Sequence, residues 1–231
     1  MFLMKYNFIK LSALFALTAV FFISCREERL APPPETTTAN ASFVEQFDSV
    51  GLLSTKGWVF MNNSEPGGVT QWTQGQPGYF PAYSSNWGGL DYASISYSVS
   101  TGLGSAVKIS SWMITKPILA KNGDQVSFYT RTYSPVFYPD RMQFRANLVD
   151  DNPDVGLEAE TVGNFTTLIA DINPNMTVTG YPTTWTKISW TVTGLPANTS
   201  RKIRFAFRYY FTNNLNNGLY IGVDQFEFIS I

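Results

Sequence analysis

The stretch RKIRFAFRYYF, residues 201–211, has the clearest secondary-structure pattern in the chain. Apolar or aromatic side chains occupy every second position along it, namely Ile203, Phe205, Phe207, Tyr209 and Phe211. Successive side chains of a β-strand point to opposite faces, so this alternation predicts one long strand with an apolar face. Arg204 and Arg208 fall on the other face. We expect the strand to bury only its apolar face.

The same alternation recurs in shorter runs elsewhere in the chain. It is present in DQVSFYTRTY (124–133), RMQFRANL (141–148) and KISWTV (187–192), and residues such as Gly, Pro and Asn separate the runs. About ten strands of this kind fit the chain, and neither a long helical period nor a fixed repeat is present. We therefore predict an all-β fold, a jelly-roll β-sandwich of two packed antiparallel sheets, over residues 41–231.

The N-terminus has the pattern of a secretory signal that ends at a lipid attachment site. Residues 1–24 carry two lysines and then an apolar run that is too short to span a bilayer. In FFISCREERLAPPP (21–34) this run ends at Cys25, the only cysteine in the chain. Ser24-Cys25 resembles a bacterial lipobox, in which the cysteine is acylated and the signal is cut before it. We expect a lipoprotein signal peptide at 1–24 and a lipid on Cys25; the alternative is an ordinary buried cysteine behind a simple signal.

Residues 25–40 are expected to form a tether between the membrane and the domain. They contain three consecutive prolines and a threonine cluster, and they have no apolar periodicity. Arg26, Glu27 and Glu28 follow Cys25 directly. This run resembles the signal that sends lipoproteins of Gram-negative bacteria to the outer face of the outer membrane, although any solvated tether also contains charges. We expect an outer-membrane lipoprotein that is exposed on the cell surface and held by its lipid anchor.

Charge and composition exclude several classes of function. The chain has 16 basic and 17 acidic residues and no histidine. Removal of residues 1–24 would leave 14 basic and 17 acidic residues, a net charge of −3. This balance does not fit a nucleic-acid-binding surface. The lack of histidine excludes Ser-His and Cys-His catalysis as well as histidine-based zinc or iron sites. Any chemistry would therefore depend on carboxylates, tyrosines, lysines or a hard cation.

Three segments of the predicted sandwich are distinctive: WMITKP (112–117), VGNFT (162–166) leading to INP (172–174), and YIGVD (220–224). In this order, within residues 41–231, they resemble the choice-of-anchor J domain, a relative of the cleaved-adhesin modules of gingipain-type proteases. Lys116 is an insertion relative to that pattern, and Gln225 stands where relatives often carry a second acid.

The resemblance implies a MAM-like jelly roll, usually an accessory module of surface-anchored proteins without enzyme activity of its own. We therefore expect a non-catalytic adhesin-like domain that binds a glycan or a cell-surface protein. One alternative is a structural subunit of a surface assembly that binds no small ligand. Another is a carboxylate-based glycoside hydrolase, which needs two carboxyl groups roughly 5–10 Å apart in a cleft. The acids of this chain cluster in one loop instead, at 150–160.

Acidic residues near the two ends of the domain are candidates for a structural Ca²⁺ site. Glu45 falls in the first predicted strand and Asp224 in the last, and the terminal strands of such jelly rolls run side by side. Two carboxylates held close together repel unless a proton or a cation intervenes. Because related adhesin modules carry calcium in this region, the resemblance implies Glu45, Asp224 and Asp48 as ligands. The alternative is that they are solvent-facing strand ends.

A second acidic segment, DDNPDVG (150–156), resembles a calcium loop but lacks the EF-hand pattern. Its glycine comes one place late, and position twelve is Thr161 instead of glutamate. We interpret this segment as a solvated acidic loop.

Two loops contain aromatic residues that are candidates for stacking on sugar rings. GYFPAYSSNWGG (78–89) has no charged residue, and we favour Tyr83 and Trp87 within it. SPVFYPD (134–140) presents Phe137 and Tyr138 between prolines. Loops on a rigid sandwich commonly carry binding residues. The alternative for the first loop is that Tyr79 and Phe80 cap the core.

Overall fold

The computed structural model describes residues 42–83, 89–102, 107–213 and 217–231. The expected signal peptide, Cys25, the tether and Trp87 lie outside these residues. Within the described part of the chain, no helix is both long and apolar enough to cross a bilayer.

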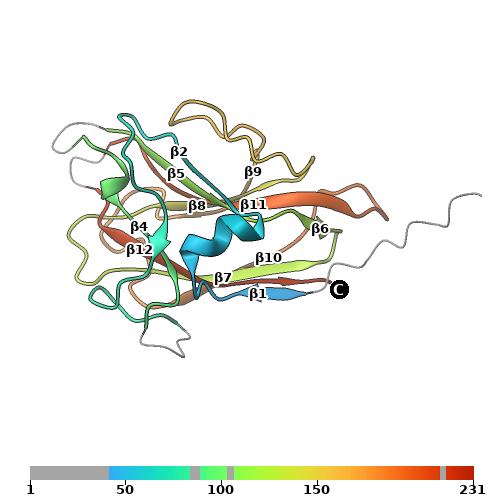
Figure 1. The fold of residues 1–231 in the computed structure, drawn as a ribbon, viewed down its shortest axis with the longest axis horizontal. Helices are drawn as coiled ribbons and strands as arrows, with labels where there is room; N and C mark the ends of the chain where they lie inside the picture. The colour runs from blue at the N-terminus through green and yellow to red at the C-terminus, as the bar shows by residue number, and fades with distance from the viewer. Residues whose placement is uncertain (1–41, 84–88, 103–106, 214–216) are drawn as a thin grey trace, which may run out of the picture. The chain divides into compact units, whose positions relative to one another are not determined.

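The domain is an all-β sandwich of two antiparallel sheets, as predicted (Figure 1). The first sheet has the order β10-β7-β12-β4-β3, and β1 also pairs with β12. Its strands are β1 (Phe43–Glu45), β3 (Thr73–Gln74), β4 (Ala93–Ser96), β7 (Gln125–Thr132), β10 (Thr186–Thr191) and β12 (Tyr220–Ile229). The second sheet has the order β2-β5-β11-β8-β9, and β6 also pairs with β11. Its strands are β2 (Val59–Asn62), β5 (Ile109–Ile114), β6 (Ile118–Ala120), β8 (Met142–Asn147), β9 (Thr167–Ile172) and β11 (Arg201–Phe211).

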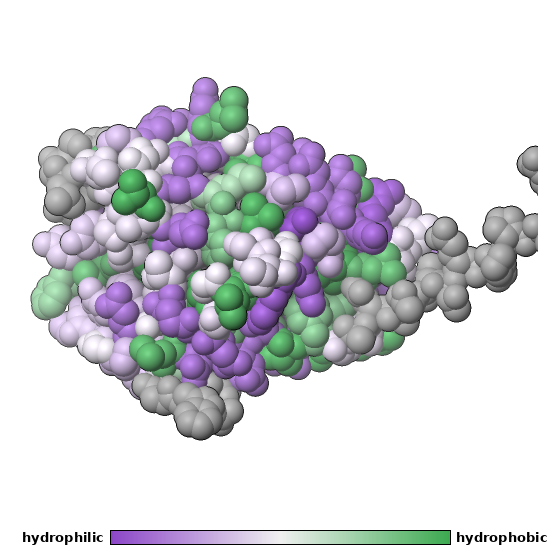
Figure 2. Space-filling model, viewed as in Figure 1, coloured by the Kyte–Doolittle hydropathy of each residue, from purple (hydrophilic) through white to green (hydrophobic). Residues whose placement is uncertain are grey.

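The described residues also form two short 3₁₀ helices: η1 (Val50–Lys56) and η2 (Tyr97–Val99). In Figure 1, η1 lies across the opening between the two sheets, and its Val50 and Leu53 are buried. Figure 2 shows that hydrophobic residues on this face of the molecule occur in separate places among hydrophilic ones.

The core lies between the sheets and is dominated by aromatic rings. β11 spans the predicted residues, and each of its five alternating apolar side chains is at most 1% exposed. Phe207 packs edge-on against Phe128 of β7 with ring centroids 4.9 Å apart, and Phe205 stacks on Phe144 at 5.6 Å. Burial of so many large rings supplies most of the driving force for folding.

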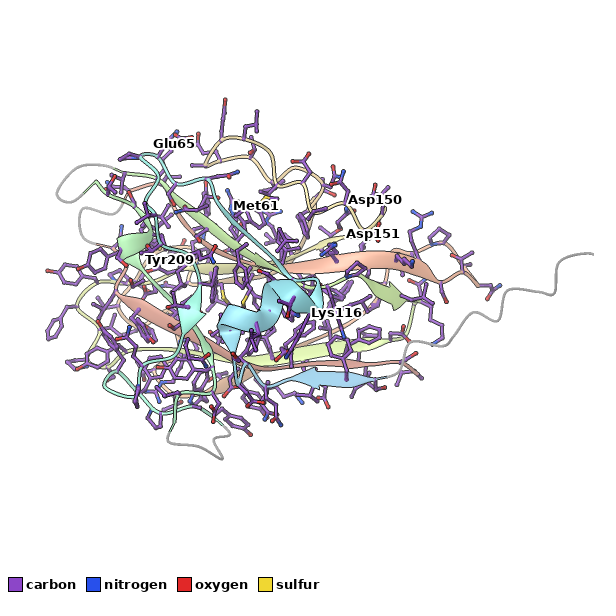
Figure 3. All side chains as sticks on the ribbon, viewed as in Figure 1. Met61, Glu65, Lys116, Asp150, Asp151 and Tyr209 are labelled. Atoms are coloured by element: carbon purple, nitrogen blue, oxygen red, sulfur yellow. The ribbon has the colours of Figure 1, made fainter. Side chains whose placement is uncertain are left out.

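The opposite face of β11 is also buried, so the expectation that this strand would bury one face was wrong. Arg204 is 9% exposed, Ala206 is fully buried, and Arg208 is 1% exposed. The loop 148–166 covers this face, and Figure 3 labels Asp150 and Asp151 on it. Val155 and Phe165 of the loop pack with Trp112, Ile114 and Ala206 as a second apolar cluster.

The outer face of the first sheet is covered over only part of its length. An aromatic cluster of Phe80, Tyr92, Tyr220 and Trp185 packs on it beside Gly222 of β12. A Cβ atom at Gly222 would lie 2.8 Å from the rings of Phe80 and Trp185, so this close approach requires glycine. The other end of the same face forms the groove described below.

Candidate ligand-binding site

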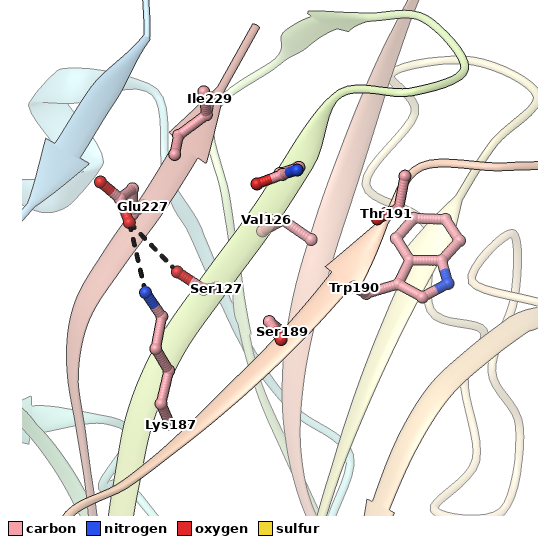
Figure 4. Close-up of a pocket in the computed structure, with 9 residues that line it drawn as sticks. Val126, Ser127, Lys187, Ser189, Trp190, Thr191, Glu227 and Ile229 are labelled. Carbon is pink, nitrogen blue, oxygen red and sulfur yellow. Dashed lines mark hydrogen bonds and ion pairs between the residues drawn. The ribbon is translucent and has the colours of Figure 1, made fainter. Parts of the chain in front are cut away.

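An open groove of about 400 Å³ lies on the outer face of the first sheet (Figure 4). It is lined by residues of three neighbouring strands: Gln125, Val126 and Ser127 of β7, Lys187, Ser189, Trp190 and Thr191 of β10, and Glu227 and Ile229 of β12. We call this site the groove.

Strand register explains why these side chains meet. Ser127 is paired with Ser189 on one side and with Glu227 on the other. Gln125 is paired in the same way with Thr191 and Ile229. Directly paired residues of antiparallel strands project to the same face, so each row places three side chains next to one another.

The charges of the groove form a loose, exposed pair. Glu227 Oε2 lies 3.7 Å from Lys187 Nζ and 3.3 Å from Ser127 Oγ, as the dashed lines in Figure 4 mark. The side chains of Lys187 and Glu227 are 47% and 34% exposed. Such pairs contribute at most about 1 kcal/mol, so a ligand can replace either partner at little cost. Among the described residues that line the groove, Glu227 is the one carboxylate.

Tyr83 lies next to the groove, and residues of the first sheet hold its ring and its backbone in place. Its ring stacks on Tyr129 of β7 with centroids 3.7 Å apart, and its backbone N–H donates to Asp224 Oδ2 at 2.9 Å. Tyr129 is paired with Lys187, whose Nζ lies 5.9 Å from the Tyr129 ring centroid. Tyr83 remains 45% exposed. One face of this ring is therefore supported while the side chain still reaches solvent at the end of the groove.

The other predicted aromatic residues lie elsewhere. Phe137 and Tyr138 are 69% and 48% exposed in the connection between β7 and β8. Phe80 is buried in the aromatic cluster, which agrees with the alternative that it acts as a cap. Tyr79 stacks on Tyr220 at 4.0 Å and is 39% exposed. Trp87 lies outside the described residues, so it stays a prediction.

The structure does not gather Glu45, Asp48 and Asp224 into a calcium site. β1 does run beside β12, as expected, but Glu45 is paired with Phe226, a core residue. Asp224 is paired with Tyr129, whose side chain lies on the outer face. Glu45 contacts Lys56 Nζ at 3.1 Å, and no group of three potential metal ligands occurs among the described residues. The expected ligands are therefore not brought together in the described residues, and calcium binding by the protein stays a prediction.

The acidic loop at 150–156 uses its carboxylates to hold its own backbone. Asp150 Oδ1 accepts hydrogen bonds from Asn147 Nδ2 at 2.6 Å and from the backbone N–H of Asn152 at 3.0 Å. Asp154 Oδ1 accepts from the backbone N–H of Gly156 at 2.8 Å. Local bonds of this kind are typical of turns.

Most residues of the groove carry no motif that could have identified them in the sequence. Gln125, Ser127, Ser189 and Thr191 are ordinary polar residues at the outward positions of predicted strands. Only the register of β7, β10 and β12 shows that they share one surface.

Comparison with known proteins supports the fold. No protein-family model and no curated protein matches the sequence. The K1 cleaved adhesin domain of Lys-gingipain from Porphyromonas gingivalis W83 has a TM-score of 0.54 and 17% identity, over 83% of this chain and 99% of that domain. The K2 cleaved adhesin domain of Lys-gingipain has a TM-score of 0.51 and 20% identity, over 81% and 99%. At these identities the likeness shows the fold alone: this chain has the β-sandwich fold of cleaved adhesin domains.

Proposed function

We propose that this protein is a surface binding domain that holds a glycan chain in the groove. The observation that carries the proposal is the groove itself, where hydroxyl, amide, ammonium and carboxylate groups of three strands meet beside Tyr83. A sugar ring has polar groups around its edge and an apolar face. A site for it therefore combines several short polar side chains with an aromatic ring.

The residues of the groove have separable roles in this proposal. Gln125, Ser189 and Thr191 would exchange hydrogen bonds with sugar hydroxyls, because each is an outward residue with donor and acceptor groups. Tyr83 would stack on the sugar, since Tyr129 already supports one face of its ring. A ring that is held in place before binding loses little conformational entropy.

The number of carboxylates in the groove favours binding over hydrolysis as the function of the site. Glycoside hydrolysis needs an acid and a second carboxylate that flank the scissile bond. Among the described lining residues, Glu227 is the one carboxylate, and it forms an ion pair with Lys187. We propose that Glu227 accepts hydrogen bonds from the ligand and takes no part in chemistry.

We further propose that the domain is displayed on the cell surface by a lipid on Cys25. The apolar run up to Ser24 and the Pro/Thr-rich segment 25–40 support this arrangement. Two or three acyl chains on one cysteine hold a protein stably on a membrane, whereas a single chain does not.

A glycan array tests the binding proposal. We expect the purified protein to bind a defined set of glycans, and Tyr83→Ala to weaken that binding about tenfold or more, as loss of a central aromatic contact does. Tyr97→Ala is the matched control, because Tyr97 is 38% exposed on η2 and does not line the groove.

Two results of this glycan array would overturn the proposal. A wild-type protein that binds no glycan, with and without added Ca²⁺, would favour a structural subunit of a surface assembly. Binding that survives Tyr83→Ala at full strength and is lost in Tyr97→Ala would place the ligand away from the groove.

A further inference from the structure

The outer face of the second sheet carries three arginines around Gln143: two bond to it directly, and the third is linked to it through Asp171. Gln143 of β8 accepts hydrogen bonds at Oε1 from Arg145 Nε at 2.9 Å and from Arg208 Nη1 at 3.2 Å. Its Nε2 donates to Asp171 Oδ2 of β9 at 3.1 Å. Asp171 in turn accepts from Arg141, at 2.8 Å from Nε and 2.5 Å from Nη2. We call Arg141, Arg145 and Arg208 the arginine cluster.

Among the described residues, one carboxylate, Asp171, forms an ion pair with the three guanidinium groups of the arginine cluster. Asp171 pairs with Arg141, and neither Arg145 nor Arg208 has a carboxylate ion-pair partner among the described residues. Arg208 is held by Ser110 Oγ at 3.0 Å and by the backbone carbonyl of Ala159. These neutral acceptors satisfy its hydrogen bonds but not its charge.

Three of the five acidic residues in the loop above this face have other partners. Asp150 and Asp154 accept hydrogen bonds from their own loop. Glu160 lies 3.0 Å from Lys108 Nζ. The loop therefore covers the face without supplying a carboxylate to Arg145 or Arg208.

An uncompensated charge in a partly buried site is unfavourable, and a bound anion would relieve it. Burial lowers the pKa of Arg208 to about 9 and also lowers the pKa of Arg145, and Arg141 adds to both effects. The Tyr210 ring lies under two of the guanidinium groups, with the Cζ atoms of Arg208 and Arg141 at 3.7 and 5.2 Å from its centroid.

We infer that the arginine cluster binds an oxyanion, the carboxylate or sulfate group of an acidic ligand. Two of the guanidinium groups have N–H donors available for a ligand, because Arg141 Nη1 and Arg145 Nη2 make no hydrogen bond to any described residue. The planar guanidinium fork matches carboxylate and sulfate oxygens, and Asp171 already occupies Arg141 in this way. This site lies on the sheet opposite to the groove, so the inference does not rest on glycan binding.

Titration calorimetry of the purified protein at constant ionic strength tests the inference, with sodium sulfate, sodium glucuronate and neutral glucose as probes. We expect sulfate or glucuronate to bind and glucose to be silent at this site. Arg145→Gln should weaken anion binding about tenfold, since it removes one charged donor. Asp171→Asn should strengthen binding, because it removes the carboxylate that competes for Arg141.

Controls separate this site from general charge effects and from the groove. Lys202→Gln removes one exposed positive charge elsewhere on β11 and should leave affinity unchanged, as should Tyr83→Ala. Sulfate binding alone would assign a sulfate group, and glucuronate binding alone a sugar carboxylate. The inference is overturned if neither anion binds, if Arg145→Gln behaves like Lys202→Gln, or if Asp171→Asn weakens binding.

Discussion

At the scale of single residues, Asp124 ties the end of the chain to the start of β7. Its carboxylate accepts hydrogen bonds from Lys121 Nζ at 2.7 Å, from the Lys121 backbone at 2.9 Å and from the Ile231 backbone at 3.1 Å. Burial raises the pKa of Asp124, but these donors outweigh it and hold the pKa below its ordinary value. An acid with a lowered pKa in the folded state stabilises the fold above its unfolded pKa of about 4, and this contribution is lost as pH falls through the folded value.

We therefore predict that Asp124→Asn lowers the free energy of unfolding by about 1.5–3 kcal/mol at pH 7. The difference from wild type should shrink as the pH falls below about 4, because the carboxylate is then protonated in the unfolded chain but still ionised in the folded one, and it should vanish below the folded pKa. Urea unfolding at a series of pH values from 7 to 3 measures this. A difference that stays constant over that range would show that the charge of Asp124 contributes nothing.

Gln225 shows how one residue can change the face of the sheet on which its neighbours lie. Residues two apart normally share a face, so a regular strand would place Asp224 on the same face as the core residue Phe226. Gln225 has a φ of 49°, and the register slips by one residue between Asp224 and Glu227. This β-bulge turns Asp224 to the outer face, where it holds Tyr83. A non-glycine residue at positive φ is uncommon, so the alternation pattern gives no warning of it.

At the scale of elements, β11 could be predicted from its sequence, whereas the cover on its second face could not. The alternation of Ile203, Phe205 and Phe207 indicates the strand, which spans Arg201–Phe211. Arginine on the opposite face suggests exposure. In the folded protein Arg208 is buried because the loop 148–166 and the rings of Trp112 and Tyr210 surround it. Such a contact between distant segments leaves no local signal.

Phe165 should be the main anchor of this covering loop. It is fully buried, and its ring centroid lies 5.8 Å from that of Trp112 of β5. We predict that Phe165→Ala lowers the free energy of unfolding by about 3–5 kcal/mol, because it leaves a cavity between loop and sheet.

Leu157→Ala provides the matched control for this prediction, since Leu157 lies on the same loop and is 95% exposed. It should change stability by less than about 0.5 kcal/mol. Thermal or urea unfolding of both variants gives the comparison. Equal effects of the two substitutions would mean that the loop is not anchored through Phe165.

At the scale of the whole molecule, the fold could be predicted and the groove could not. Alternating runs and turn residues indicate a two-sheet sandwich, because the apolar face of each strand can be recognised in that strand's own sequence. The groove depends on which strands become neighbours: β7 and β12 are far apart in the chain yet lie side by side. Of the aromatic residues predicted to stack on a sugar, Tyr83 lies next to the groove, while Phe137 and Tyr138 lie in another loop.

The proposed attachment to the membrane concerns the chain as a whole, and Cys25 is its predicted point. We predict that Cys25→Ala moves the protein into the soluble fraction and abolishes labelling with a palmitate analogue, because no acyl chain remains to hold it. Cell fractionation and metabolic labelling measure the two effects. A Cys25→Ala variant that stays with the membrane would show that another part of the chain anchors it.

If the outer face of the first sheet binds the glycan, a bulky side chain in the groove should block binding. Ser189 is exposed on β10 and lines the groove, so Ser189→Trp should occupy the space without disturbing the core. Thr179→Trp adds the same bulk at an exposed residue that does not line the groove. On the glycan array we predict that Ser189→Trp abolishes binding and Thr179→Trp retains it. Binding by Ser189→Trp at wild-type strength would contradict glycan binding in the groove.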